Sequence, residues 1–156
     1  MSGNDHRTAY EIGYALLDMT KAAYFANDFT LFARAFMLPH EHVTLQGFAV
    51  LETEEDLRML FDRMQAEFQR LEVDNIARQL ISAEFVTPHN ILATAVTQLF
   101  SNGVLANQPF AVQSTLLRCG QHWRIATANY AIPLDAGGLP DAIMPDAFPS
   151  EIKGMG

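Results

Sequence analysis

Apolar residues recur at helical spacing along the first part of the chain, where no proline occurs before Pro39. Spacing of this kind is typical of one side of a helix, which predicts a first helix over roughly 7–27. Asn27 and Asp28 favour a break and a new N-cap, so a short second helix is expected at about 29–36, ending before Pro39. The apolar positions of the first helix are Tyr10, Tyr14, Leu17, Ala22 and Phe25.

The strongest local pattern lies between residues 53 and 71. Thr53 precedes three consecutive acidic residues, which is close to the capping-box signature of a helix start with an acidic first turn. Ahead of it, residues 40–52 are typical of two short strands joined at Gln46 and Gly47, because glycine permits the positive φ of a tight hairpin. The apolar stripe that predicts an amphipathic third helix is Leu57, Leu60, Phe61, Met64, Phe68 and Leu71.

From residue 76 onward the pattern changes to that of strands. Four segments rich in β-branched residues, 76–86, 90–100, 109–119 and 122–132, are separated by short polar turns. Short turns imply antiparallel neighbours, since parallel strands need long crossovers. Strands of about ten residues are long enough to curve, and three helices are present to cover them. The sequence therefore predicts an α+β fold, with a cone-shaped, strongly curved antiparallel sheet and three N-terminal helices on its concave face.

The end of the chain has a different composition. Four of the seven prolines follow residue 132, with Gly137 and Gly138 between them, so no regular structure is expected there. The predicted division is one domain over 1–134 and a Pro/Gly-rich arm over 135–156. Its apolar residues favour an extended arm that packs on the body or on a second subunit; the alternative is a disordered tail.

Three segments carry a resemblance to a known family: 24–39 (YFANDFTLFARAFMLP), 51–64 (LETEEDLRMLFDRM) and 114–132 (STLLRCGQHWRIATANYAI). In order and spacing they resemble the passage from the first helix to the second, the acidic-capped third helix and the closing hairpin of the nuclear transport factor 2-like superfamily, with its SnoaL-like and ketosteroid isomerase-like members. The resemblance covers about residues 7–132. It implies a conical pocket between sheet and helices, and dimerisation through the sheet.

The resemblance does not imply one function. Members of the superfamily include ketosteroid isomerase, polyketide cyclases, scytalone dehydratase, limonene epoxide hydrolase and purely binding domains, so the fold alone cannot select among them. Isomerase chemistry of the ketosteroid type needs a carboxylate base, and Leu45 and Gln46 stand where that acid is expected. The Asp-Arg-Asp relay of the epoxide hydrolase is also disfavoured, because the later strands contain no Asp.

Composition and charge further limit the possible kinds of partner and the expected location of the protein. Hydrophobic residues make up 49% of the chain and charged residues 18%, which favours a large core, an apolar cavity or a subunit interface. The net charge of −8 argues against binding to nucleic acid or to anionic membranes. No apolar run reaches the roughly 20 residues that span a bilayer. Cys119 is the single cysteine, and the first ten residues lack the pattern of a secretory signal, so a cytoplasmic location is expected.

His40 and His42 are the most conspicuous polar pair. Alternate residues of a strand share a face, which puts their Cα atoms roughly 6.6 Å apart, with Glu41 pointing the other way. Three interpretations remain open: an acid/base pair lining the pocket, two ligands of a metal ion, or a hydrogen-bonded or surface pair with no chemical role. A metal would need a third ligand. The residues considered for it are His89, Glu84 and His122.

Other polar groups stand among apolar strand residues, as a small-molecule site requires. Arg78 is suited to hold an anion if it faces the pocket, because a guanidinium binds a carboxylate by two hydrogen bonds; otherwise it is a charge on the strand surface. Glu84 is expected on the same strand face as Arg78. The predicted ligand-binding residues are Tyr14, Arg78, Gln98, Asn129 and Tyr130.

These observations predict a homodimeric protein whose apolar pocket binds a small organic molecule. If it is an enzyme, a cyclase, isomerase or dehydratase without an organic cofactor or metal fits best, with His42, His40 and Tyr24 as the catalytic candidates. The alternative is a non-catalytic module that dimerises or binds a partner protein.

Overall fold

Three helices precede most of the sheet in the computed structural model, which describes residues 6–44 and 47–131. Helix α1 spans Ala9–Ala26, α2 spans Phe29–Arg34 and α3 spans Glu54–Arg70. Each begins at a side-chain cap, and those of α1 and α3 are full capping boxes, at Thr8 and at Thr53. The three predicted helices are confirmed to within about two residues at each end, because their start signals and stripes are local.

The strands form one sheet in the order β2-β1-β7-β6-β4-β3, with β5 paired to β4. The four predicted long strands are confirmed as the antiparallel meander β3, β4, β6 and β7. Strand β1 departs from the prediction in two ways: it begins at Phe36, before Pro39, and it pairs parallel with β7. The strand bounds are Phe36–Thr44 (β1), Gly47–Leu51 (β2), Asn75–Thr87 (β3), Asn90–Ser101 (β4), Val104–Leu105 (β5), Phe110–Cys119 (β6) and His122–Asn129 (β7).

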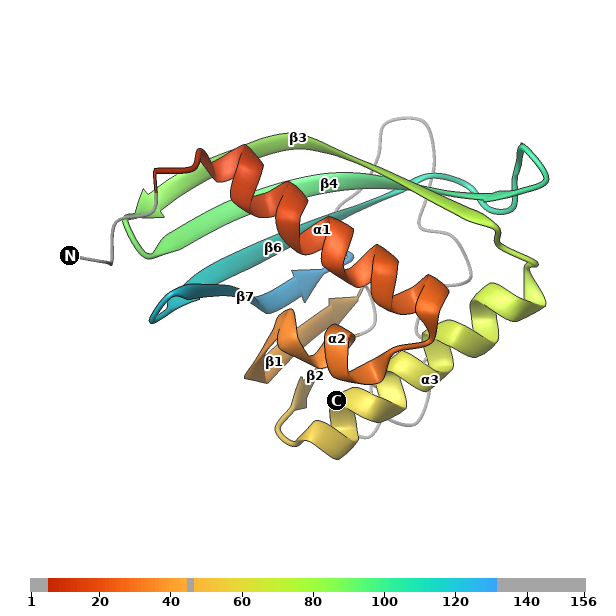
Figure 1. The fold of residues 1–156 in the computed structure, drawn as a ribbon, viewed down its shortest axis with the longest axis horizontal. Helices are drawn as coiled ribbons and strands as arrows, with labels where there is room; N and C mark the ends of the chain where they lie inside the picture. The colour runs from red at the N-terminus through yellow and green to blue at the C-terminus, as the bar shows by residue number, and fades with distance from the viewer. Residues whose placement is uncertain (1–5, 45–46, 132–156) are drawn as a thin grey trace.

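The helices cover one face of the sheet. Figure 1 shows α1 running diagonally across β3, β4 and β6, while α2 and α3 lie at the end where β1 and β2 complete the sheet. The core between these layers holds Phe32, Phe61 and Leu57, each less than 2% exposed. The sheet is mixed but mostly antiparallel, and the α+β prediction with helices on one face is confirmed.

Irregularities in two strand pairs change which side chains face the helices. The register of β3 against β4 shifts between Leu80 and Ser82, and that of β6 against β7 shifts between Thr115 and Leu116. A bulge of this kind bends the strand and reverses the side-chain alternation beyond it. The Tyr14 hydroxyl of α1 accepts the Leu80 backbone N–H at 3.0 Å, so this helix is fixed to β3 at its bulge.

Three further predictions concern membrane-spanning segments, the C-terminal arm and the turn at Gln46 and Gly47. No helix in the described part of the chain is long and apolar enough to cross a bilayer. The predicted arm, 135–156, lies outside the described residues, as does the turn at Gln46. Gly47 has the predicted positive φ, 144°.

Removing the cap of α3 gives a local test of the fold. Thr53→Ala is expected to lower the free energy of unfolding by about 1 kcal/mol, because the Thr53 hydroxyl accepts the Asp56 N–H at 3.1 Å. Urea unfolding measures this, with Thr30→Ala on exposed α2 surface as the matched control. A loss equal to that of the control would contradict the role of the cap.

Candidate functional site

A cavity lies between α1, the end of α3 and the concave face of the sheet. Its volume is about 110 Å³. This is of the same order as the engineered apolar cavity of about 150 Å³ that binds benzene. Most of its wall is apolar, including Leu16, Leu17, Met64, Phe68 and Leu80. The size and lining suit a single ring or a short branched molecule.

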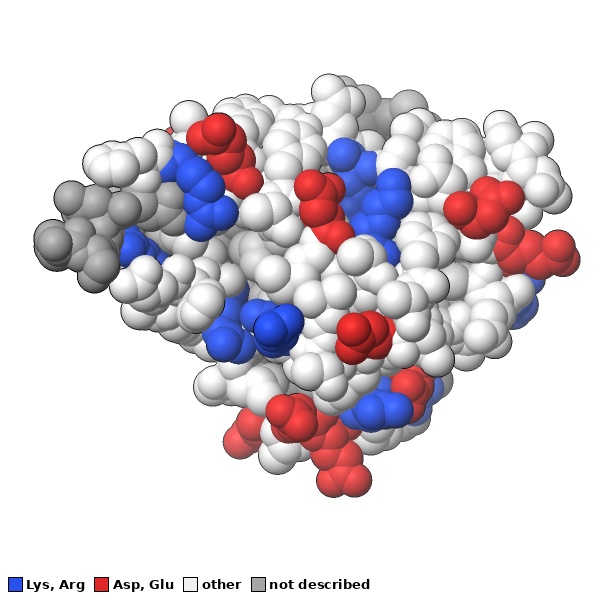
Figure 2. Space-filling view, in the orientation of Figure 1, with Lys and Arg blue, Asp and Glu red and all other residues white. Residues whose placement is uncertain are grey.

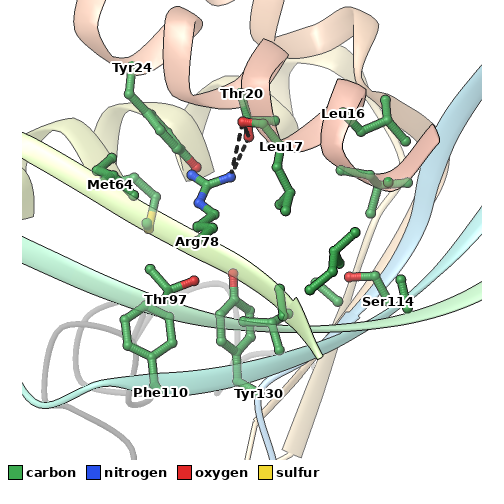
Figure 3. A pocket seen from close by; sticks show the side chains of 18 of the residues that line it. Leu16, Leu17, Thr20, Tyr24, Met64, Arg78, Thr97, Phe110, Ser114 and Tyr130 are labelled. Atoms are coloured by element: carbon green, nitrogen blue, oxygen red, sulfur yellow. Dashed lines mark hydrogen bonds between the residues drawn. The ribbon is translucent and has the colours of Figure 1, made fainter. Parts of the chain in front are cut away.

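Polar groups enter this wall from four elements and the segment after β7. Figure 3 shows Thr20 and Tyr24 from α1, Arg78 from β3, Thr97 from β4, Ser114 from β6 and Tyr130 from just after β7. The Tyr24 and Tyr130 hydroxyls and the Arg78 guanidinium all point toward the same part of the cavity (Figure 3). A mainly apolar surface with a few convergent polar groups is the usual composition of a small-molecule site.

Arg78 is the one positive charge in this wall among the described residues. Its Nη1 donates to Thr20 Oγ1 at 2.6 Å and to Leu17 O at 3.4 Å, and its Cζ lies 5.8 Å from the centroid of the Tyr24 ring. No carboxylate of residues 6–44 and 47–131 forms an ion pair with it. Burial lowers the pKa of Arg78, opposed by Tyr24, Tyr130 and Asp18; an arginine still stays charged in a protein. The guanidinium is therefore a desolvated cation, and its N–H groups other than those on Nη1 are not used in these hydrogen bonds.

The two phenols next to Arg78 are neutral hydrogen-bonding groups. Burial raises the pKa of Tyr24 and of Tyr130, and the positive charge of Arg78 opposes both shifts. Neither hydroxyl has a hydrogen-bond partner in the described part of the chain. The Tyr24 ring is held by stacking on Phe61, with centroids 6.0 Å apart, and by an edge contact with Phe68 at 5.0 Å. Buried polar groups in native proteins are almost always satisfied, so a ligand or water belongs between these side chains.

Three residues predicted to bind ligand lie elsewhere. The Tyr14 hydroxyl is engaged by Leu80 at the β3 bulge. Gln98 stands between Thr97 and Leu99, which both line the cavity, so its amide is on the outer face of the sheet. Asn129 is likewise on that face, and its Oδ1 accepts the Ala131 N–H at 2.9 Å. None of the three lines the cavity, and a ligand-binding role for them stays a prediction.

His40 and His42 are buried on the helix-covered face of β1, and Glu41 between them is exposed, as predicted. His40 Nδ1–H donates to Ile125 O at 3.3 Å, and its ring packs edge-on against Phe36. The His42 ring lies 4.8 Å from that of Tyr130. Neither imidazole lines the cavity itself, but His40 contacts the cavity residues Phe36 and Ile125, and His42 lies next to the cavity residue Tyr130. The catalytic role predicted for the pair stays a prediction.

Burial keeps both imidazoles neutral. Loss of hydration lowers the pKa of His40 to about 4, opposed by its hydrogen bond to Ile125, and burial together with His40 lowers the pKa of His42 to about 3. The surface interpretation of the pair is therefore wrong. The third metal ligands considered, His89, Glu84 and His122, are all exposed, and no group of three His, Cys, Asp or Glu gathers within the described ranges.

The expected placement of Arg78 and Glu84 on the same strand face is also wrong. Arg78 and Leu80 face the cavity, but beyond the bulge Ala83 pairs with the cavity residue Ala93, and Glu84 pairs with the exposed Leu92. Directly opposed residues of an antiparallel pair point to the same side, so Glu84 points away from the helices. The regular alternation of side chains along a strand gives the wrong face for Glu84, because the bulge adds one residue between Arg78 and Glu84.

Three polar residues of the cavity wall were not predicted: Thr20, Thr97 and Ser114. Thr20 had a usable signal, since it lies four residues before Tyr24 and three after Leu17 on the same helix face. No signal in the sequence indicated Thr97 or Ser114. Alternation along a strand predicts two faces, but it does not predict which of them meets the helices.

Comparison with protein-family models gives no match, and comparison with curated protein sequences gives none either. Solved structures do match. A domain of unknown function with a cystatin-like fold from Nostoc punctiforme has a TM-score of 0.61 and 16% identity, over 83% of this chain and 82% of that one. A nuclear transport factor 2-like protein of unknown function from Shewanella oneidensis has a TM-score of 0.61 and 6% identity, over 78% and 98%.

A ketosteroid isomerase-like protein from Erwinia carotovora atroseptica also matches, with a TM-score of 0.52 and 13% identity over 77% of this chain and 92% of that one. Such identities establish the fold and no more. The chain has the nuclear transport factor 2-like fold, as the resemblance implied.

Proposed function

We propose that this protein binds a small, mainly apolar organic molecule whose anionic oxygen is held by Arg78, with Tyr24 and Tyr130 as further hydrogen-bonding partners. The single observation that carries the proposal is the Arg78 guanidinium, directed into an apolar cavity without a carboxylate partner in the described chain. Desolvating a cation without an opposite charge is costly. A bound carboxylate would supply that charge and accept two parallel hydrogen bonds.

The size of the cavity limits the molecule. A volume of about 110 Å³ leaves room for one ring and a carboxylate but not for a fused polycyclic compound in the conformation described. The apolar walls at Leu16, Leu17 and Leu80 would contact the ring, while the acid group would lie at Arg78. Monocyclic carboxylic acids are therefore the ligand class that the geometry supports best.

A catalytic version of the proposal has one observation in its favour. A cation and a phenol directed at one point can stabilise negative charge that develops on a substrate oxygen, as in enolisation or elimination of water. Cyclase, isomerase or dehydratase chemistry without a cofactor would use this feature, and a ketosteroid isomerase-like protein shares the fold. The described cavity wall holds no carboxylate or imidazole that could act as the base, so binding is the better-supported function.

Assembly and location form part of the proposal. Exposed apolar residues on the outer face of the sheet, Ile81 at 55% and Leu92 at 38%, support a homodimer that packs through this face. The lone Cys119 supports a cytoplasmic site of action. A non-catalytic partner-binding module would use the same outer face, and sedimentation of the pure chain separates the two: a monomer would count against the homodimer.

Calorimetric titration with matched ligands tests the binding proposal. Benzoate and cyclohexanecarboxylate are expected to bind saturably and to raise the melting temperature, whereas benzyl alcohol and cyclohexanemethanol, of similar shape, bind at least about tenfold more weakly, since they lack the charge that Arg78 requires. At a ligand concentration of about 100 times Kd the stabilisation should reach about 2.7 kcal/mol. Equal affinity for the acids and alcohols, or no binding of either, would overturn the proposal.

A further inference from the structure

A second depression lies on the surface beside α1, on the other side of Leu16 from the cavity. It has a volume of about 400 Å³ and is formed by the start of α1, the end of α2 and the turn between β6 and β7. We call it the arginine groove, because Arg7, Arg34 and Arg124 line it together with His122. Leu16 contributes to both walls, so the groove and the cavity are neighbouring but separate sites.

The groove concentrates positive charge on an acidic protein. The chain carries ten Lys and Arg against eighteen Asp and Glu, yet none of the described residues that line the groove is acidic. Figure 2 shows blue side chains over the left part of the helix-bearing face, where α1 and β7 begin, with red atoms beside them at the upper left; further blue and red side chains lie in the centre and to the right, and red ones along the lower edge. The three arginines come from distant parts of the chain, with Arg7 just before α1, Arg34 in α2 and Arg124 in β7.

Two of these arginines lack an ion pair within the described chain. Arg34, in the last turn of α2, is exposed and makes no hydrogen bond or ion pair there. Arg124 donates from Nη1 to Phe36 O at 3.4 Å, a contact that orients the side chain without neutralising it. Glu54 shares an adjoining depression with Arg124 but forms no ion pair with it. The guanidinium groups of Arg34 and Arg124 are thus available to an anion.

The indole of Trp123 is an independent indication of a ligand. Trp123 lines the groove and is 6% exposed, and its buried Nε1–H has no hydrogen-bond partner among residues 6–44 and 47–131. Leaving a buried donor unsatisfied costs about 1–3 kcal/mol, so such a donor is normally paired with a ligand or water. This N–H belongs to a residue that lines the same groove as the arginines, and it is a further donor for an oxygen acceptor with negative charge.

We infer that the arginine groove is a binding site for the phosphate group of a small molecule. Guanidinium groups hold phosphate oxygens in bidentate fashion. A tetrahedral phosphate presents oxygens in several directions, which suits a groove lined by Arg34 of α2 and by Arg124 and Trp123 of β7. The inference does not depend on the function proposed for the cavity, since no group of the cavity other than Leu16 takes part.

Trp123 is the single tryptophan of the chain, so its fluorescence reports on the groove directly. Inorganic phosphate, pyrophosphate and phenyl phosphate are titrated separately while Trp123 emission is recorded, with calorimetry as a second readout. We expect saturable binding that changes Trp123 emission and weakens as salt is raised. Tightest binding of inorganic phosphate or pyrophosphate identifies a free phosphate ligand, whereas tightest binding of phenyl phosphate identifies a phosphorylated organic one.

Matched variants separate the groove from general charge effects. Arg34→Gln is exposed and should fold normally, and it is expected to weaken binding about tenfold, because one charged hydrogen-bonding group is lost. Arg58→Gln, an exposed arginine on α3 outside the groove, carries the same charge change and should leave the affinity unchanged. Absence of saturable binding for all three anions, or equal weakening by the two variants, would overturn the inference.

Discussion

Lowering the pH from 7 to 5 is expected to remove about 3–4 kcal/mol of folding free energy, because His40 and His42 cannot protonate inside the fold. Their pKa values are lowered to about 4 and about 3 by burial, whereas an unfolded histidine has a pKa of about 6.5. A loss of this size is a large part of the 5–15 kcal/mol that typically stabilises a domain. The protein is therefore expected to lose much of its folding free energy between pH 7 and pH 5, because of two histidines that are buried in the fold.

The direction follows from proton counting. Between the unfolded pKa of about 6.5 and the folded values of about 4 and about 3, the unfolded chain binds two protons that the folded chain does not. Stability is then fully present above about pH 7 and falls as the pH falls, with a slope of about 2.7 kcal/mol per pH unit near pH 5. Phe36, the Ile125 carbonyl and Tyr130 contact the rings, and none of these three groups is a carboxylate that could stabilise an imidazolium.

Urea unfolding at pH 7, 6 and 5 measures this slope. The double variant His40→Gln/His42→Gln should flatten it, whereas His89→Gln, at an exposed position, should leave it unchanged. NMR titration of the imidazole protons in the unsubstituted protein gives a second measurement that needs no variant. Ring resonances of His40 and His42 that titrate near pH 6.5 in the folded protein would contradict the prediction.

Arg78→Met is expected to weaken the binding of a monocyclic carboxylic acid by about a hundredfold. Each hydrogen bond to a charged group contributes about 1.5–3 kcal/mol, and the proposed carboxylate would lose two of them. The fold itself should lose little, because Thr20 keeps its own hydrogen bond to Leu17 O at 3.1 Å. Replacing a desolvated, unpaired charge by an apolar side chain is often neutral or stabilising, so the melting temperature is expected to be unchanged or higher.

Calorimetric titration with benzoate, alongside thermal unfolding, tests both parts of this prediction. Arg78→Lys keeps the charge but not the bidentate geometry, and an intermediate affinity is expected for it. Arg58→Met on the outer surface of α3 is the matched control, since it removes an arginine that does not line the cavity. Wild-type affinity for benzoate in Arg78→Met would rule out Arg78 as the anion-binding group.

A gain in stability on losing Arg78 would also distinguish a ligand site from a structural one. Arginines that serve the fold are paired, as Arg70 is with Glu67 at 2.6 Å. Arg78 instead faces two phenols and a hydroxyl, none of which carries a negative charge. Proteins commonly retain such a destabilising arrangement where function requires it.

The sequence by itself determined the helices and the meander. Thr8 and Thr53 cap their helices through side chains only three residues away, and the stripe from Leu57 to Phe68 needs no partner to be recognised as helical. Short turns fixed the antiparallel order of β3, β4, β6 and β7 for the same reason. These features depend on contacts between residues close in the chain, so local pattern and propensity suffice to predict them.

Only the tertiary structure decided which side chains share a site. Arg78 faces the cavity and Glu84 does not, because a bulge lies between them. The residue at the bulge, Ile81, is not of a type that predicts one. His40 and His42 are buried because β1 pairs parallel with the last strand, which lies more than 80 residues away in the chain. The face of the sheet that a side chain occupies depends on the strand register and on strand partners that are distant in the chain. A shift of the register by one residue moves the side chain to the opposite face. The chemistry of this protein therefore rests on contacts between elements, which its local sequence pattern does not encode.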